Sequence, residues 1–161
     1  MIVVSDTSPL MNMAIISQLE ILTELYGEVV IPQAVHDELV LKGQGMPGSQ
    51  QIRSLPWLTV RQVRNDSLVI ALRLQLDRGE SEAIALAIEL GADLLLIDER
   101  KARAVAQQFN LEYTGLLGLL IEAKEKGFIT AVEPLLRSLR EKAGFWISDP
   151  LYDYVLRSAG E

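Results

Sequence analysis

The sequence predicts an α/β fold in which helices cover both faces of a mostly parallel sheet. Residues 94–97 form an uninterrupted aliphatic run that ends at Asp98, and residues 2–5 form a similar strand-like run that ends at Asp6. Short runs of this kind are typical of strands that are buried on both faces. Strand-like and helix-like segments then alternate with short connections, which is the pattern of an α/β domain.

The first half of the chain predicts three strands, each followed by a helix. Thr7 and Ser8 carry hydroxyls that can cap free N–H groups, and Pro9 favours a first helical turn. A helix is therefore expected from here to about residue 25, where Gly27 follows. The other expected elements are strands at residues 29–31 and 57–60, the latter compatible with a sheet edge, helices at residues 33–42 and 67–76, and a glycine-rich loop at residues 43–51.

Residues 79–91 have the most regular helical pattern in the chain. With Glu80 as position i, positions i+3, i+4, i+7, i+8 and i+11 are small or apolar, which predicts an amphipathic helix with an acid at its start. Glu82 lies about 200° from Glu80 around the helix axis, at about 100° per residue. The phase therefore points Glu80 toward the sheet edge and separates it from Glu82.

The rest of the chain predicts one more strand pair and then only helices. After the strand at residues 94–97 we expect a helix at residues 100–109, a last strand at residues 111–114 and an apolar helix that Gly127 closes. Residues 131–161 predict helices, with Pro134 and Pro150 in first turns. We expect one domain over residues 1–161, in which residues 131–161 form a helical extension packed on its side or in a subunit contact.

The composition supports one core and excludes several kinds of site. With 161 residues, of which 49% are hydrophobic, the chain can form one substantial core. The absence of cysteine excludes disulfides, thiol nucleophiles and cysteine-bound zinc or iron–sulfur sites. His36 is the only histidine, which excludes a two-histidine metal site, and its expected place is a helix surface.

The charge and hydropathy patterns predict a soluble, cytoplasmic protein that does not enter a membrane. The chain does not begin with a basic segment before an apolar one, and no apolar run reaches the length of a membrane span. The net charge of −7 argues against coating nucleic acid through a general basic field. Local binding remains open if cations neutralise acids where a phosphate would approach.

Four acids are the candidate site residues: Asp6, Glu38, Glu80 and Asp98. Ligands of parallel sheets bind beyond the carboxyl ends of the strands, which is where Asp6 and Asp98 lie. Each acid also has a structural alternative. Asp6 and Asp98 can cap the helices that follow them, and Glu80 can interact favourably with the dipole of its helix from the first turn. Glu38 can be a solvated side chain on a helix flank.

A convergence of these acids would require a counterion. Carboxylates about 5 Å apart repel each other by about 3 kcal/mol per pair at an effective dielectric constant of about 20. An all-oxygen site prefers Mg²⁺ or Mn²⁺, and such an ion suits phosphodiester hydrolysis. Ser8 and Asn12 would be polar companions of this site, and Arg100 and Arg103, close to Asp98 in the chain, could contact a substrate.

Other chemistries have less support in the sequence. A Ser-His-Asp triad would need His36, and neither a nucleophile elbow nor a phosphate-binding loop of the Gly-x-x-x-x-Gly-Lys type is present. A phosphatase with Asp6 as nucleophile is conceivable, although the residue two positions on is Ser8 and not a second acid. The aromatic residues Trp57, Phe145 and Trp146 are expected to pack in the core and not to stack on bases.

Four segments resemble the successive motifs of PIN-domain proteins, and more narrowly the PIN-like branch related to the VapC toxins of prokaryotic toxin–antitoxin pairs. They are Ser-Asp-Thr-Ser-Pro-Leu at residues 5–10, Ile-Pro-Gln-Ala-Val-His-Asp-Glu-Leu at residues 31–39, Gly-Glu-Ser-Glu-Ala-Ile-Ala-Leu-Ala at residues 79–87, and Leu-Leu-Ile-Asp-Glu-Arg-Lys-Ala-Arg at residues 95–103. Residues 115–120, 124–129 and 144–147 are also similar to that branch, so the resemblance covers nearly the whole chain.

The resemblance implies a three-layer α/β/α fold around a sheet of about five strands. It also implies an Mg²⁺- or Mn²⁺-dependent ribonuclease that cleaves single-stranded RNA, a cognate antitoxin and a homodimer. The metal-binding and catalytic acids would be Asp6, Glu38, Glu80 and Asp98, with Ser8 beside Asp6, Glu82 as the substitute for Glu80, and Glu99 as a weaker one. The alternative function is a catalytically silent PIN-like module that binds RNA or protein.

Overall fold

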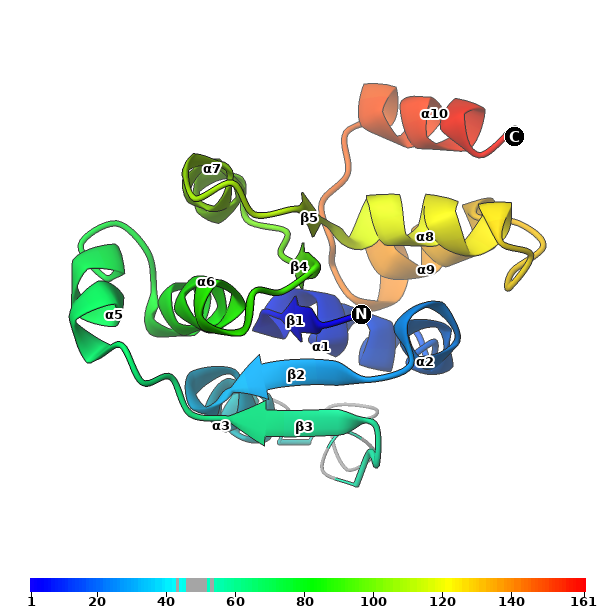
Figure 1. Ribbon diagram of the computed structural model, residues 1–161. Helices are drawn as coiled ribbons and strands as arrows, with labels where there is room; N and C mark the ends of the chain where they lie inside the picture. Colours follow the sequence, from blue (N-terminus) through cyan, green and yellow to red (C-terminus); the bar gives the residue numbers. More distant parts are fainter. Residues whose placement is uncertain (43, 46–51, 53) are drawn as a thin grey trace.

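The computed structural model describes residues 1–42, 44–45, 52 and 54–161, and within them the strands form one five-stranded parallel sheet (Figure 1). The strands are β1 (Val3–Ser5), β2 (Val29–Pro32), β3 (Leu58–Arg61), β4 (Leu94–Leu96) and β5 (Tyr113–Thr114). Their order is β3-β2-β1-β4-β5, and every neighbouring pair is parallel. The predicted parallel sheet is therefore confirmed, and β3 lies at an edge.

Helices follow the strands in the predicted order. They are α1 (Thr7–Ile15), α2 (Glu20–Tyr26), α3 (Gln33–Lys42), α5 (Asp66–Leu72), α6 (Arg78–Leu90), α7 (Arg100–Gln108), α8 (Leu116–Glu125), α9 (Glu133–Lys142) and α10 (Asp149–Ser158). The loop predicted at residues 43–51 lies, except for residues 44–45, outside the described residues.

The helices cover both faces of the sheet because successive strand residues point to opposite faces. Val3 of β1 and Leu96 of β4 are buried in one apolar cluster with residues of α1, α2, α8 and α9. Val4 and Leu95 are buried in a second cluster with residues of α6 and α7. The result is the expected three-layer α/β/α sandwich.

The sheet order brings the carboxyl ends of β1 and β4 side by side. Their register pairs Ser5 with Leu96, and the N–H of Asp6 continues the pairing by donating to the Leu96 carbonyl at 2.9 Å. From β1 the chain moves to β2 and β3 on one side, whereas β4 and β5 occupy the other side. Asp6 and Asp98 thus follow the two strands at the topological switch point, where ligands of open α/β sheets bind.

The single helix predicted from residue 7 to about residue 25 is wrong, because the structure divides it into α1 and α2. Ser17 adopts a left-handed conformation with φ of 58°. The N–H groups of Ser17 and Gln18 donate back to the carbonyls of Ala14 and Met13, which terminates α1. No glycine or proline marks this break, and the apolar pattern continues across it, so the sequence predicted one continuous helix.

The last part of the chain is helical, as predicted. Pro134 and Pro150 lie in the first turns of α9 and α10, where their missing N–H groups cost nothing. Figure 1 shows α10 beyond α8 and close to the C-terminus, and Val155 of α10 is buried in the same cluster as α8 and α9. No helix in the described part of the chain has the length and apolar character needed to cross a bilayer.

Candidate functional site

The structure places the four predicted acids around one cavity of about 470 Å³ at the carboxyl ends of β1 and β4. Asp6 follows β1, Glu38 projects from α3, Glu80 from the first turn of α6, and Asp98 follows β4. The cavity is also lined by Thr7, Ser8, Met11, Asn12, Asp77, Glu99 and Phe145. Four segments that are far apart in the sequence therefore meet at the site.

The first turn of α1 holds two of the acids in place. The Thr7 hydroxyl donates to Glu38 Oε2 at 2.6 Å, and the Ser8 hydroxyl donates to Asp98 Oδ2 at 3.2 Å. Asn12, one turn further on, donates from Nδ2 to Ser8 Oγ at 3.0 Å. The sequence assigned these hydroxyls to capping of backbone N–H groups, whereas in the structure both donate to carboxylates of other elements and the N-cap position of α1 is Asp6.

Asp98 lies at the start of a helix, but not of the one that follows it in sequence. Its Oδ1 accepts the backbone N–H of Leu116, the first residue of α8, at 2.6 Å. At the start of α7 the N-cap is Glu99, whose side chain makes no capping hydrogen bond. The Asp6 side chain likewise makes no capping hydrogen bond at the start of α1. The capping alternative fails for both helices to which the sequence assigned it.

Glu80 has a structural role in addition to its place in the cavity. Asp77 is the N-cap of α6, and its Oδ1 accepts the N–H of Glu80 at 2.8 Å, while Glu80 Oε1 accepts the N–H of Asp77 at 3.1 Å. This reciprocal pair is a capping box. The sequence interpretation missed Asp77, although an acid followed three residues later by Glu80 at the start of a helical pattern is the signature of that motif.

Glu82 lies apart from this cavity, as its helical phase predicted. Its Oε1 accepts the backbone N–H of Ala34 at 3.1 Å, and its Oε2 accepts Nε of Arg78 at 3.2 Å. It is therefore tied to the first turn of α3. Glu99, in contrast, lines the acidic cavity, and its charge contributes to raising the pKa of Glu80.

The electrostatic environment disfavours ionised carboxylates at the sheet edge. Burial and, to a smaller extent, the charges of Glu80, Asp77 and Glu38 together raise the pKa of Asp6 to about 7, against the lowering effect of a hydrogen bond with the Thr7 backbone. Burial also raises the pKa of Asp98, although Leu116, Ser8 and Arg103 act in the opposite direction. Asp6, which is 6% exposed, is thus buried among like charges.

The donor chemistry of the cavity fits a divalent cation that prefers oxygen. Carboxylate and hydroxyl oxygens line most of it, and the sequence has no cysteine that could supply a thiolate for a softer metal. In the described residues, no three His, Cys, Asp or Glu side chains are grouped so that they could hold one ion together. Mg²⁺ usually keeps several waters and binds one or two carboxylates, so the cavity fits a hydrated cation better than a fully protein-bound one.

The predicted substrate-binding arginines occupy different places. Arg103 is half-buried, lies near Asp98 and lines a neighbouring cavity of about 310 Å³. Arg100 is the first residue of α7 and has an exposed side chain.

The aromatic residues depart in part from their prediction. Trp57 and Phe145 are partly buried against the core, as expected. Trp146 is 82% exposed and lines the neighbouring cavity, so the expectation of core packing is wrong for this residue. No helical or strand periodicity covers residues 143–148, which form the extended connection between α9 and α10, and the apolar character of Trp146 alone suggested burial.

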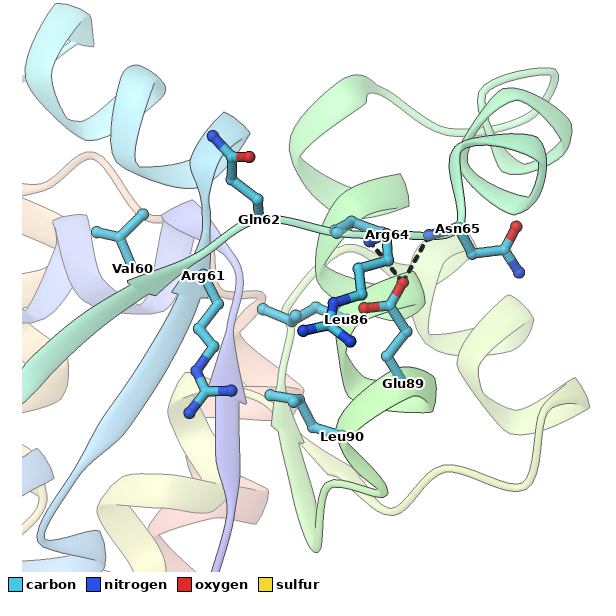
Figure 2. Close-up of a pocket in the computed structure, with 9 residues that line it drawn as sticks. Val60, Arg61, Gln62, Arg64, Asn65, Leu86, Glu89 and Leu90 are labelled. Atoms are coloured by element: carbon cyan, nitrogen blue, oxygen red, sulfur yellow. Dashed lines mark hydrogen bonds between the residues drawn. The ribbon is translucent and has the colours of Figure 1, made fainter.

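A larger cavity, of about 880 Å³, lies between the end of β3 and the second half of α6 (Figure 2). Arg61 and Arg64 line it, and the Glu89 carboxylate at its wall accepts the backbone N–H groups of Arg64 and Asn65 at 2.7 Å. None of the four predicted acids lines this cavity. Although this cavity is larger, the carboxylates with raised pKa values line the smaller acidic cavity, which is therefore the better candidate for a reactive site.

Comparison with known proteins agrees with the fold. A protein-family model described as a PIN domain matches residues 2–161, which is nearly the entire sequence. None of the curated proteins matches the chain. The family match, together with the five-stranded parallel sheet and its helical layers, shows that the chain belongs to the PIN-domain family.

Proposed function

We propose that the protein is an Mg²⁺- or Mn²⁺-dependent endoribonuclease that hydrolyses single-stranded RNA at the acidic cavity. PIN domains are generally metal-dependent nucleases, and the family match supports this class of activity. The observation that carries the proposal is the meeting of Asp6, Glu38, Glu80 and Asp98 around one cavity at the switch point of the sheet. These acids come from four separate elements, and none of their local structural roles requires that they meet.

Asp6, Glu38, Glu80 and Asp98 would hold the cation, in part through water molecules, since no three acids in the described residues are grouped to hold one ion directly. When bound, a divalent cation would polarise the phosphate and lower the pKa of an attacking water. The water adds to phosphorus, and the bond to one ester oxygen breaks, which leaves a phosphate monoester on one fragment and a hydroxyl on the other.

The chain's own groups position these acids and limit their movement. The Thr7 hydroxyl donates to the Glu38 carboxylate at 2.6 Å, and the Leu116 N–H donates to the Asp98 carboxylate at the same distance. The partners of metal-binding carboxylates commonly set metal affinity. Arg103, which lies near Asp98, supplies a positive charge for a phosphate of the substrate.

Removal of single acids tests the proposal. Asp6→Asn and Asp98→Asn should each abolish Mn²⁺-dependent cleavage of single-stranded RNA, while circular dichroism shows an intact fold. Calorimetric titration should reveal a Mn²⁺ site in the wild type that EDTA empties and that Asp6→Asn weakens. Cleavage at the wild-type rate by either variant would rule out this mechanism.

A biological role follows from the resemblance to toxin-related PIN domains. We propose that the protein is the toxin of a toxin–antitoxin pair, acts in the cytoplasm, forms a homodimer and is neutralised by a cognate antitoxin. Expression of the wild type should arrest growth, and Asp6→Asn should not. Co-expression of a protein that restores growth and co-purifies with the chain would identify the antitoxin.

A second candidate function is a catalytically silent module that binds RNA or protein. Two observations favour it: in the described residues no three acids are grouped around one ion, and Glu80 is engaged in the capping box of α6. This function predicts that Mn²⁺ titration gives no heat and that RNA binding is the same in EDTA and in Mg²⁺. The nuclease predicts the opposite result in both measurements.

A further inference from the structure

A second cavity, of about 310 Å³, adjoins the acidic cavity. Asp98 and Phe145 line both, so the two cavities share a wall. The second cavity, which is the neighbouring cavity described above, is otherwise lined by residues of α7, β5, the first turn of α8, the connection between α9 and α10, and the first turn of α10. A polymer that crosses the acids in this direction must pass along Trp146 and Arg103, which lie in its lining.

Trp146 is held at the surface by an anchored backbone. Its side chain is 82% exposed, whereas the next residue, Ile147, is 4% exposed. The Phe145 N–H donates to the Leu139 carbonyl at 3.0 Å, and Arg140 Nη2 donates to the Ile147 carbonyl at 2.6 Å. Both neighbours of Trp146 are therefore attached to α9. Because this backbone is already ordered, binding to the exposed indole would not have to order a loose segment at an entropic cost.

Arg103 lines the second cavity close to Asp98, one of the two residues that both cavities share. A Cβ on Gly115 would be 3.4 Å from Arg103 Nη1 and 2.8 Å from Asp98 Oδ1, so both charged groups lie against this glycine. The surface thus changes from carboxylates to a guanidinium and aromatic rings over a short distance. A nucleotide has matching groups, because its phosphate is an anion and its base offers a flat face for stacking.

We propose that the second cavity binds the nucleotide next to the scissile phosphate of single-stranded RNA, with its base stacked on Trp146 and its phosphate at Arg103. This inference rests on the proposed ribonuclease function and names the residues that receive its substrate. A single strand fits because its bases are free to stack on protein, whereas those of a duplex are stacked on one another. The shared wall at Asp98 and Phe145 connects this nucleotide with the acids.

Fluorescence can detect the stacking directly. The chain has two tryptophans, so Trp57→Phe leaves Trp146 as the only indole. Asp6→Asn in the same protein prevents cleavage, and Mg²⁺ serves as the cation because it does not quench indole emission. A short single-stranded RNA should quench Trp146, while an abasic strand of the same length, with the same charge and no bases, should not.

Affinity measurements give an independent readout. Trp146→Ala should weaken RNA binding about tenfold, because one base loses its stacking partner. Phe128→Ala is the matched control, since Phe128 is an exposed aromatic residue, 41% exposed, beyond the other end of α8, and it should stay within about twofold of the wild type. Arg103→Gln should lower the slope of log affinity against log salt concentration by about one.

The outcomes separate this inference from the proposed function. If the wild type cleaves RNA and Asp6→Asn does not, but Trp146 is not quenched and Trp146→Ala binds RNA normally, the nucleotide site is wrong. If the wild type does not cleave RNA but single-stranded RNA quenches Trp146 and the abasic strand does not, the nuclease is wrong and the nucleotide site stands.

Discussion

The carboxylate of Glu38 lies directly against the backbone of Gly79, so closely that a Cβ on Gly79 would be 2.6 Å from Glu38 Oε1. Glu38 belongs to α3 and Gly79 to the first turn of α6. The opposite oxygen of the same carboxylate accepts the Thr7 hydroxyl. The Glu38 side chain is therefore confined between α1 and α6. It fits there because residue 79 is a glycine and has no side chain to occupy the same space.

Gly79→Ala should displace Glu38 and leave the fold intact. The added methyl group meets the end of a flexible side chain, which can rotate away, and alanine in a helix gains up to about 1 kcal/mol over glycine. We expect at least about tenfold slower RNA cleavage, because small misplacements of reactive groups are costly, and a change in unfolding free energy of less than about 1 kcal/mol. Urea unfolding and cleavage rates measure both. Wild-type cleavage in a folded variant would show that the position of Glu38 does not matter.

Thr7→Val should weaken cation binding, whereas Thr7→Ser should not. Valine keeps the branched shape but removes the hydroxyl that donates to Glu38 at 2.6 Å, and serine retains that donor. Loss of such a supporting hydrogen bond lowers metal affinity by about 10- to 100-fold in other sites. Calorimetric titration with Mn²⁺ compares the two variants. Equal affinities for valine and serine would remove Glu38 from the proposed cation site.

Glu80→Gln and Glu82→Gln distinguish the two acids of α6. Glu80 lines the acidic cavity, and glutamine can still accept the Asp77 N–H, so α6 should remain capped while a negative charge is lost. Glu82 binds Ala34 and Arg78 instead. We expect about tenfold or greater loss of Mn²⁺-dependent cleavage for Glu80→Gln and less than about twofold for Glu82→Gln. The reverse ranking would make Glu82 the third acid.

Asp6→Asn should stabilise the protein at alkaline pH in the presence of EDTA. Burial and neighbouring charges raise the pKa of Asp6 from 3.8 to about 7, so the folded state favours the protonated carboxyl. This contribution to stability is complete below about pH 4 and is lost as the pH rises through about 7. Asparagine does not titrate, and the unfolding free energy of the variant minus that of the wild type should rise by about 2 to 3 kcal/mol between about pH 5 and pH 8.

Urea unfolding at the two pH values measures this difference directly. Because both proteins retain Glu80 and Asp98, whose pKa values are also raised, their shared titration cancels to a first approximation. Addition of Mg²⁺ at pH 8 should stabilise the wild type more than the variant, since a bound cation favours the ionised carboxylate. A difference between the proteins that does not change with pH would contradict the buried, uncompensated state of Asp6.

Several features of the site followed from local sequence alone because their physical cause is local. The aliphatic runs before Asp6 and Asp98 predicted two buried parallel strands that end at acids, and the structure has both. The helical phase separated Glu80 from Glu82 because the angle per residue of an α-helix is constant. The end of α1 at Ser17, in contrast, depends on a left-handed residue that has no glycine to announce it.

The partners of the acids could not be predicted, because each hydrogen bond joins elements that only the sheet order brings together. Asp98 accepts the N–H of Leu116, 18 residues later, at the start of α8, and Thr7 binds Glu38 across 31 residues. The exposure of Trp146 likewise results from the attachment of its neighbours to α9.

The sequence by itself determined the α/β class, the parallel sheet and the location of two acids at strand ends, because periodicity and strand termination are properties of short segments. The tertiary structure decided that β1 and β4 are neighbours, that α3 and α6 bring their glutamates to the same edge, and that this edge continues into the cavity at Trp146. Which strands pair, and which helix starts face one another, depends on burial of the whole apolar surface at once. No single segment contains that information.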